Sequence, residues 1–232
     1  MVSREDNIIF KIKTFLKKYP RVFFFFYYTM GVFVGKSAKK AIRDIHEGAT
    51  IINLGSGSKI IREDVVNVDF KKHPGINVVA DVCNLPFDDN SVDAVISESL
   101  MEHLKDPQKS VEEILRVLKP GGLVYIVTPF MLGYHSSPGD YYRWTMSGLR
   151  ELLKDFEEKE MGVAMGPTNA MTYMLREWLA LILSFGSNTL YQIWTMFFMV
   201  VFAPLNLLDF ILARFKSAKN SAYAYYFIGT KR

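Results

Sequence analysis

The chain is poor in cysteine and only weakly biased in charge. Its 232 residues include one cysteine, Cys83, so an intrachain disulfide framework is excluded and a reducing compartment is expected. The formal net charge is +4, and no RNA-binding module or aromatic–basic pattern accompanies the lysines. These shortages argue against a disulfide-stabilised scaffold and against nucleic acid as the partner.

Two stretches, residues 22–35 and 179–208, contain no Asp, Glu, Lys or Arg. The first is shorter than the ~20 residues that a spanning helix needs, and the lysines that follow it come without a signal-peptide cleavage pattern. The second is long enough, but residues 186–189 break it and Pro204 interrupts it again. We therefore expect interfacial or re-entrant helices attached to one side of a membrane.

The N-terminus shows a basic amphipathic pattern. Apolar residues between Ile8 and Tyr19 share one helical face, and the lysines of this segment lie largely elsewhere. Such a helix would lie on an anionic bilayer, or its apolar stripe would dock on the rest of the protein. A membrane surface is the partner that this pattern favours.

Three short runs rich in Val and Ile, at residues 50–58, 65–69 and 78–81, predict parallel strands. The first run ends in the glycines Gly55 and Gly57, which permit a sharp turn and let backbone N–H groups approach a ligand. In an open α/β sheet, the carboxyl ends of such strands form a nucleoside-cofactor site.

Two carboxylates end the next two strands. Asp69 is suited to accept hydrogen bonds from ribose hydroxyls, and Asp81 could accept one from the adenine amino group. Leu85 would form part of the wall around the adenine base. A nicotinamide dinucleotide is the alternative cofactor. Its sequence motif needs a third glycine at the position of Ile60, and an acidic residue about 20 residues after the glycines, whereas Asp69 follows them sooner.

Further motifs follow in a characteristic order: a strand at residues 91–97, an EHLKDP segment at 102–107, an LKPGG turn at 118–122 and a strand at 123–128. With the Gly-rich loop and the two acidic strand ends, the chain resembles class I S-adenosylmethionine-dependent methyltransferases of the type 11 group. The resemblance covers roughly residues 48 to 165 and a last strand near the C-terminus.

The resemblance implies a Rossmann-like α/β fold with a seven-stranded sheet and S-adenosylmethionine as the cofactor. The first two crossovers are too short for the usual helices, so we expect bare loops there. No metal site is predicted. The residues expected to line the cofactor pocket are Asn53, Gly55, Ser56, Gly57, Asp69, Phe70, Asp81, Val82, Cys83, Leu85, Ser97 and Glu98.

The loop after the fifth predicted strand, residues 129–145, concentrates ionisable and aromatic groups. If the acceptor is a hydroxyl, a nearby base should take its proton, and His135 is the candidate, with Asp140 orienting it or serving as an alternate base. Tyr142 and Arg143 would position the substrate. The alternative is a structural lock, in which Asp140 pairs with Arg143 and the next residues cap a helix.

Similar H-x-x-P-x-D-Y-x-R-W-T segments occur in methyltransferases of envelope polysaccharide and surface-glycan pathways, which implies a sugar or lipid-linked acceptor. His103, in the EHLKDP segment, is expected to be a structural histidine at a helix start rather than a catalytic one. A catalytically silent member of the family, serving as a binding or scaffold protein at the membrane, is the alternative function.

Four regions are expected. Residues 1–47 form the basic and apolar N-terminal segment, 48–165 the cofactor-binding core, 166–220 an apolar helical insertion and 221–232 the final strand. The insertion would contact lipid, pack on the sheet or bury itself in a homodimer interface. We expect a cytoplasmic protein, peripheral or monotopic on the inner face of the membrane.

Overall fold

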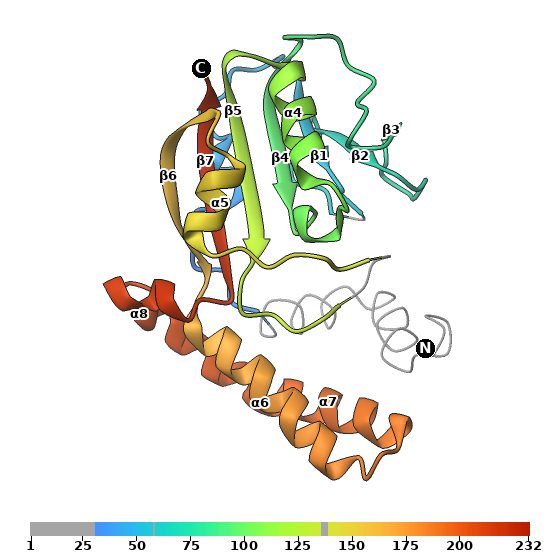
Figure 1. Cartoon of the computed structure of the whole chain (residues 1–232), viewed down its shortest axis with the longest axis vertical. Helices are drawn as coiled ribbons and strands as arrows, with labels where there is room; N and C mark the ends of the chain where they lie inside the picture. Colours follow the sequence, from blue (N-terminus) through green and yellow to red (C-terminus); the bar gives the residue numbers. More distant parts are fainter. Residues whose placement is uncertain (1–30, 58, 136–138) are drawn as a thin grey trace. The chain divides into compact units, whose positions relative to one another are not determined.

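A computed structural model describes residues 31–57, 59–135 and 139–232 (Figure 1). The predicted amphipathic helix near the N-terminus lies outside these residues. The described residues divide into a sheet unit, Gly35–Ala164 with Ala224–Arg232, and a helical unit, residues 31–34 with Met165–Tyr223. Residues 35–47, which the sequence analysis grouped with the N-terminal segment, thus belong to the sheet unit.

The sheet unit contains seven strands in the order β3-β2-β1-β4-β5-β7-β6 (Figure 1). Strands β1 to β5 pair with their neighbours in parallel, and β7 runs antiparallel to β5. This arrangement confirms the expected Rossmann-like methyltransferase sheet. The strands are β1 (Ile51–Leu54), β2 (Val66–Asp69), β3 (Val78–Val79), β4 (Val92–Glu98), β5 (Leu118–Pro129), β6 (Phe156–Met165) and β7 (Ala224–Lys231).

Burial explains why these segments form the centre of the sheet. All four residues of β1 are buried, as are most of β4 and β5, because a parallel sheet covered on both faces needs nearly continuous apolar strands. The predicted LKPGG turn is part of β5, which begins at Leu118 rather than at residue 123. Strand β7 lies between β5 and β6 in the sheet.

The crossovers differ in length as expected. No helix occurs in the described residues between β1 and β2 or between β2 and β3, whereas α4 (Pro107–Val117) connects β4 to β5. Asp106 caps α4 by accepting the backbone N–H of Lys109 at 3.1 Å, and Thr145 caps α5 (Met146–Leu152). The sheet unit also contains α3 (Ala38–Ala41) and the short helix η1 (Met101–His103).

The helical unit consists mainly of α6 (Pro167–Leu183) and α7 (Asn188–Phe202), which pack against each other (Figure 1). The predicted break between them is confirmed: Gly186 has a φ of +82°, and Ser187 caps α7. After α7 come η2 (Ala203–Leu208), which contains Pro204, then α8 (Asp209–Leu212) and η3 (Lys216–Asn220).

The helical stretch Asn188–Leu212 is long and apolar enough to cross a membrane, and 22% of its most apolar window is buried. Its acidic residue is Asp209, which is fully buried and accepts the backbone N–H groups of Thr168 and Asn169 at 2.8 and 3.0 Å. Asp209 therefore caps the N-terminus of α6, where Gly166 offers no capping side chain.

Candidate functional site

The loop after β1 has two glycines with left-handed backbone, Gly55 at φ +63° and Gly57 at φ +54°. A Cβ on Gly55 would lie 2.7 Å from Cδ1 of Leu100, so this glycine is needed for packing rather than for the approach of a ligand. A Cβ on Gly57 would meet no atom within 4 Å, and the backbone there is open to a ligand. Of the two, Gly57 has the property expected of a cofactor cradle.

Asp69 lies at the end of β2, beside this loop. Its buried carboxylate accepts the N–H of Gly57 through Oδ2 and the N–H of Lys71 through Oδ1, both at 3.0 Å. The first bond ties β2 directly to the cradle. Each carboxylate oxygen retains a second lone pair, so the carboxylate can still accept hydrogen bonds from ribose hydroxyls.

The predicted adenine side lies on the turn after β3. Asp81 is exposed and accepts the N–H of Cys83 at 2.9 Å, while Val82 and Leu85 are buried and Phe70 is 54% exposed. Burial raises the pKa of the Cys83 thiol, and Asp81 raises it further. A protonated thiol suits a pocket wall and not a nucleophile.

The remaining predicted cofactor residues are of two kinds. The hydroxyls of Ser56 and Ser97 are buried and make no hydrogen bond within the described chain, which leaves two polar groups to satisfy at this edge. Asn53 and Glu98 already have partners: the Asn53 amide donates to Asn67 at 3.1 Å, and Glu98 forms an ion pair with Lys59. The open cradle and the two hydroxyls fit a polar nucleoside cofactor.

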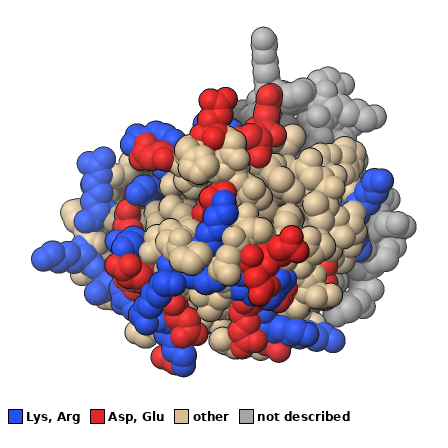
Figure 2. Space-filling model, turned by 90° about the horizontal axis from the view of Figure 1, so that it is seen from above, with Lys and Arg blue, Asp and Glu red and all other residues tan. Residues whose placement is uncertain are grey.

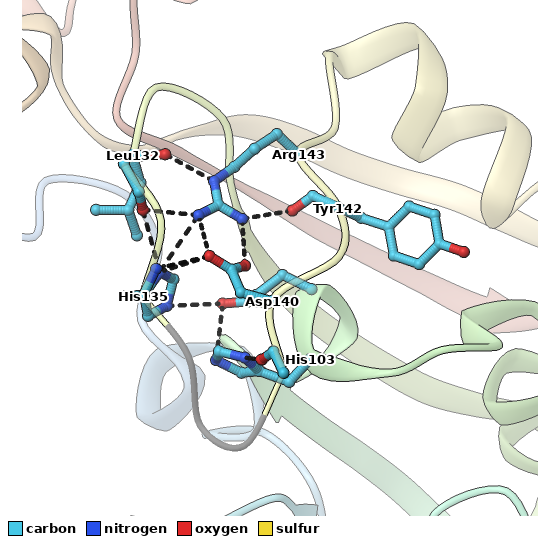
Figure 3. A network of polar contacts seen from close by, with 9 residues as sticks. His103, Leu132, His135, Asp140, Tyr142 and Arg143 are labelled. Carbon is cyan, nitrogen blue, oxygen red and sulfur yellow. Dashed lines mark hydrogen bonds and ion pairs between the residues drawn. The ribbon is translucent and has the colours of Figure 1, made fainter. Parts of the chain in front are cut away.

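The loop after β5 is locked by Arg143 (Figure 3). The guanidinium binds both carboxylate oxygens of Asp140, at 2.5 and 2.7 Å, and donates to the carbonyls of Leu132 and Gly133, each at 2.7 Å. This bidentate bond lowers the pKa of Asp140 to about 2. Asp140 is therefore a permanent anion, and the geometry favours the lock over a role as alternate base.

Asp140 also orients His135. Its Oδ2 accepts the backbone N–H of His135 at 2.7 Å and lies 3.5 Å from the ring atom Nδ1 (Figure 3). Burial lowers the pKa of His135, so the ring is neutral near pH 7 and can accept a proton. Tyr142 stands apart: its hydroxyl donates to the Lys105 carbonyl at 3.0 Å, and its ring stacks on Trp144.

Sequence reasoning missed Glu102 and gave His103 a structural role only. Glu102 is fully buried in η1, and burial raises its pKa to about 7. The Nε2 atoms of His103 and His135 each lie 3.8 Å from Oε1 of Glu102, and the two rings meet edge to face at 4.9 Å. The adjacent Glu and His of the EHLKDP segment can be read from the sequence. Their proximity to His135 is a tertiary contact, which the sequence pattern does not predict.

Comparison with known proteins agrees with this geometry. Residues 53–126 match the Methyltransferase domain family. The chain is 35% identical over 100 residues to demethylmenaquinone methyltransferase of Paenarthrobacter aurescens, covering 36% of this chain and 40% of that protein. It is 44% identical over 64 residues to an uncharacterised methyltransferase of Mycobacterium tuberculosis, covering 28% and 25%. The chain thus spans two fifths or less of the length of these relatives.

Solved structures share the fold over most of the chain. An S-adenosylmethionine-dependent methyltransferase from Thermotoga maritima is 14% identical with a TM-score of 0.53, covering 95% of this chain and 98% of that one. Phosphoethanolamine N-methyltransferase 2 of Haemonchus contortus, in complex with S-adenosylmethionine, is 18% identical with a TM-score of 0.51, covering 94% and 59%. The chain therefore contains a methyltransferase domain at residues 53–126, and its strand order and overall fold are similar to those of S-adenosylmethionine-dependent methyltransferases.

Proposed function

We propose that this protein transfers the methyl group of S-adenosylmethionine to a hydroxyl of a glycan or lipid-linked acceptor at a membrane surface. The observation that carries the proposal is the cradle at the ends of β1 and β2, where open backbone at Gly57 meets the buried Asp69 carboxylate. This combination suits a ribose and the groups attached to it.

The acceptor side is the loop after β5. The family match ends at residue 126, before this loop begins. The loop's own side chains are therefore the basis for the proposed acceptor. A neutral His135, oriented by an ionised Asp140 and facing Glu102 and His103, is a suitable place for a hydroxyl to lose its proton. Methyl transfer from a sulfonium then depends mainly on alignment and exclusion of water.

The helical unit supports attachment to a membrane because its polarity is inverted. Polar side chains lie buried between its helices, including Thr172, which donates to Asn206 at 2.7 Å, and Asp209 at the cap of α6. Large apolar side chains cover its outside instead. We call this outside the apolar surface, and its most prominent members are Trp178, Phe185, Phe197, Phe210 and Phe215.

An apolar exterior over a polar helix interface is unfavourable in water and favourable in lipid, where polar groups must pair within the protein. Amphipathic aromatic residues such as Trp178 also prefer the headgroup boundary. In the sheet unit, by contrast, acidic and basic groups are interspersed over the face shown in Figure 2, as on a water-exposed protein. The helical unit is therefore the part we assign to the membrane.

Calorimetric titration with S-adenosylmethionine, with NAD as the control ligand, tests the cofactor. We expect saturable binding of S-adenosylmethionine alone and at least a tenfold weaker affinity in Asp69→Ala. An acceptor screen on membrane fractions would follow, with transfer of the labelled methyl group as its readout. Absence of binding by folded wild-type protein would overturn the proposal.

A second candidate is a catalytically silent member of the family acting as a scaffold at the membrane. The ion pair between Glu98 and Lys59 favours it, because Lys59 competes with a cofactor for the Glu98 carboxylate. Cofactor binding without turnover across acceptor classes, or no binding at all, would move this candidate to first place.

A further inference from the structure

Three potential metal ligands converge beside the locked loop. Oε1 of Glu102 and the Nε2 atoms of His103 and His135 are separated by 3.8 Å along both carboxylate–imidazole pairs, and one ligand atom of each residue lies within 4.8 Å of the others. Glu102 and His103 come from η1, after β4, and His135 comes from the loop after β5. Figure 3 shows His103 and His135 close together. Two strands thus bring the group together at one edge of the sheet.

The carboxylate of Glu102 has no partner of the ordinary kind. The residue is fully buried, and neither Oε1 nor Oε2 makes a hydrogen bond within the described chain. Buried carboxylate oxygens are otherwise paired, coordinated to metal or protonated. This isolation is independent of the spacing of the three ligands, and it points to a missing positive partner.

The outer nitrogens of both rings already face acceptors. Nδ1 of His103 lies 2.5 Å from the carbonyl of Gly139, which places the ring proton there and directs the lone pair of Nε2 to the side of Glu102. Nδ1 of His135 lies 3.4 Å from the Gly133 carbonyl and 3.5 Å from Asp140 Oδ2, and 3.3 Å from the guanidinium Nη2 of Arg143. The two acceptors suit a ring proton on Nδ1 when Nε2 of His135 binds a metal. An imidazole lone pair and a carboxylate oxygen repel one another unless a proton or a metal cation lies between them.

The same contacts are those of a metal site. Histidines that bind a metal donate the other ring N–H to a carbonyl or a carboxylate, which fixes the tautomer and the orientation of the ring. Both histidines here have such an acceptor, and Asp140 is itself held by the two bonds from Arg143. The lock of the loop therefore supports the orientation of His135.

We propose that Glu102, His103 and His135 bind a divalent transition-metal ion, of which Zn²⁺ suits the donor set best. Two histidines and one glutamate form a known catalytic zinc set, with a fourth position left for a water or substrate oxygen. Tetrahedral bonds of about 2.0–2.1 Å place ligand atoms roughly 3.4 Å apart, so the observed 3.8 Å separations need only a slight contraction.

The metal gives the cluster a specific task. An acceptor hydroxyl held at the fourth position would be acidified by the ion and would lose its proton to water, and its oxygen would take the methyl group as the sulfonium S–CH3 bond of S-adenosylmethionine breaks. His135 would then act as a ligand instead of as the base. This use of the site depends on the proposed methyl transfer, whereas binding of the metal does not.

The test uses untagged full-length protein, freed of metal with a chelator and titrated with Zn²⁺ by calorimetry and with Co²⁺ by visible absorption. We expect one equivalent to bind and Co²⁺ to show the bands of a tetrahedral site. Glu102→Gln, His103→Asn and His135→Asn should each weaken binding at least ~10²-fold, and Asp140→Asn about tenfold with the spectrum kept. His73→Ala, which changes an exposed histidine outside the cluster, should bind as wild type does.

Circular dichroism of each variant separates loss of metal from loss of fold. Folded wild-type protein without Co²⁺ bands, or unchanged affinity in both histidine variants, would overturn the metal site. A parallel titration with S-adenosylmethionine keeps the two proposals apart. Cofactor binding without metal binding would refute only the metal site, and metal binding without cofactor binding would refute only the proposed function.

Discussion

At the scale of single residues, Gly57 and Gly121 form a matched pair. Both have left-handed backbone, with φ of +54° and +77°, and a Cβ on either would meet nothing within 4 Å. Alanine at such a position costs about 1–2 kcal/mol of backbone strain. We therefore expect Gly57→Ala and Gly121→Ala to lose similar stability in urea unfolding.

Cofactor affinity should separate the two variants. Gly57 donates its N–H to Asp69 in the cradle, whereas Gly121 lies in the first half of β5. A methyl group on Gly57 enters the space we assign to the cofactor, so its Kd for S-adenosylmethionine should rise at least tenfold while that of Gly121→Ala stays unchanged. Equal affinities in calorimetry would remove the cradle assignment.

His135→Ala should lower turnover by ~10²-fold or more and leave the affinity for S-adenosylmethionine nearly unchanged. The residue lies in the loop that we propose binds the acceptor, with Nε2 3.8 Å from Oε1 of Glu102, whereas the cradle consists of Gly57 and Asp69. The outcome is the same whether His135 takes the proton or holds a cation. Single-turnover methyl transfer with saturating cofactor is the measurement, and wild-type rates would end both roles.

At the scale of elements, local pattern predicted most of the sheet and little of the acceptor side. Runs of Val and Ile identify β1, β2 and β4 because a parallel strand buried on both faces is rich in apolar residues. The bare crossovers followed from chain length alone. Residues 35–47 could not be assigned to the sheet unit, because no periodicity ties them to a strand order.

Side-chain pairing between elements could not be predicted in the same way. Glu102 and His135 lie 33 positions apart, and only the parallel pairing of β4 with β5 brings their loops together. The Asp140–Arg143 lock, with a spacing of three, was visible as an alternative in the sequence. Long-range contacts of this kind depend on topology, so the proposed metal ligands emerged only from the structure.

Helix α4 holds the predicted adenine loop in place through Arg116. Its guanidinium donates to the carbonyls of Leu85 and Phe87 at 2.9 Å and to Glu113 at 2.8 Å, and Glu113 accepts the N–H of Leu85 at 2.7 Å. Arg116→Met should lower the free energy of unfolding by about 2–3 kcal/mol, since several charge-assisted bonds are lost. It should also weaken cofactor binding, because Leu85 is expected to form part of the wall around the base.

The same brace predicts a pH dependence. Hydrogen bonding to Arg116 lowers the pKa of Glu113 below its ordinary 4.5, so the contribution to stability is complete above that pH and is lost as the pH falls through the lowered value. The stability difference between wild type and Arg116→Met in urea should therefore shrink in acid. Arg150→Met, which breaks an exposed pair with Glu158, should cost less than ~1 kcal/mol. Equal losses in the two variants would contradict the brace.

The start of α6 depends on a close contact between Gly166 and Asp209. A Cβ on Gly166 would lie 2.4 Å from Cγ of Asp209, so Gly166→Ala should displace the carboxylate from the backbone N–H groups it caps. We expect a loss of about 1–3 kcal/mol and faster cleavage of the helical unit in limited proteolysis. Gly148→Ala, whose nearest neighbours lie at an ordinary 3.5 Å, is the control and should not be cleaved faster.

At the scale of the whole molecule, the two units differ in what they expose. The sheet unit buries its apolar strands, as an aqueous enzyme does, whereas the helical unit buries Thr172, Asn206 and Asp209 and exposes its aromatic residues. The first pattern suits water, and the second suits the membrane surface that we propose. If the helical unit faces lipid, as we propose, the methyltransferase sheet is held at the membrane surface. A lipid-linked acceptor could then be methylated without leaving the membrane.

Phe185 is the sharpest probe of this division. It follows α6 at the tip of the helical pair, is 87% exposed, and has a φ of +47°, which is strained for a residue other than glycine or asparagine. Phe185→Asn should keep or raise stability by relieving that strain, yet lower binding to phosphatidylglycerol-containing vesicles about tenfold by removing an apolar contact. Cosedimentation with vesicles measures the binding.

Ile60→Asn is the matched control, because it removes an exposed apolar side chain from the sheet unit. It should cosediment as wild type does if only the helical unit enters the lipid. Vesicles of phosphatidylcholine alone distinguish insertion of apolar side chains from attraction to anionic headgroups. Without anionic lipid the electrostatic attraction is lost, whereas apolar insertion is retained. Wild-type protein that stays in solution with both kinds of vesicle and migrates as a dimer in gel filtration would assign the apolar surface to a second copy of the chain.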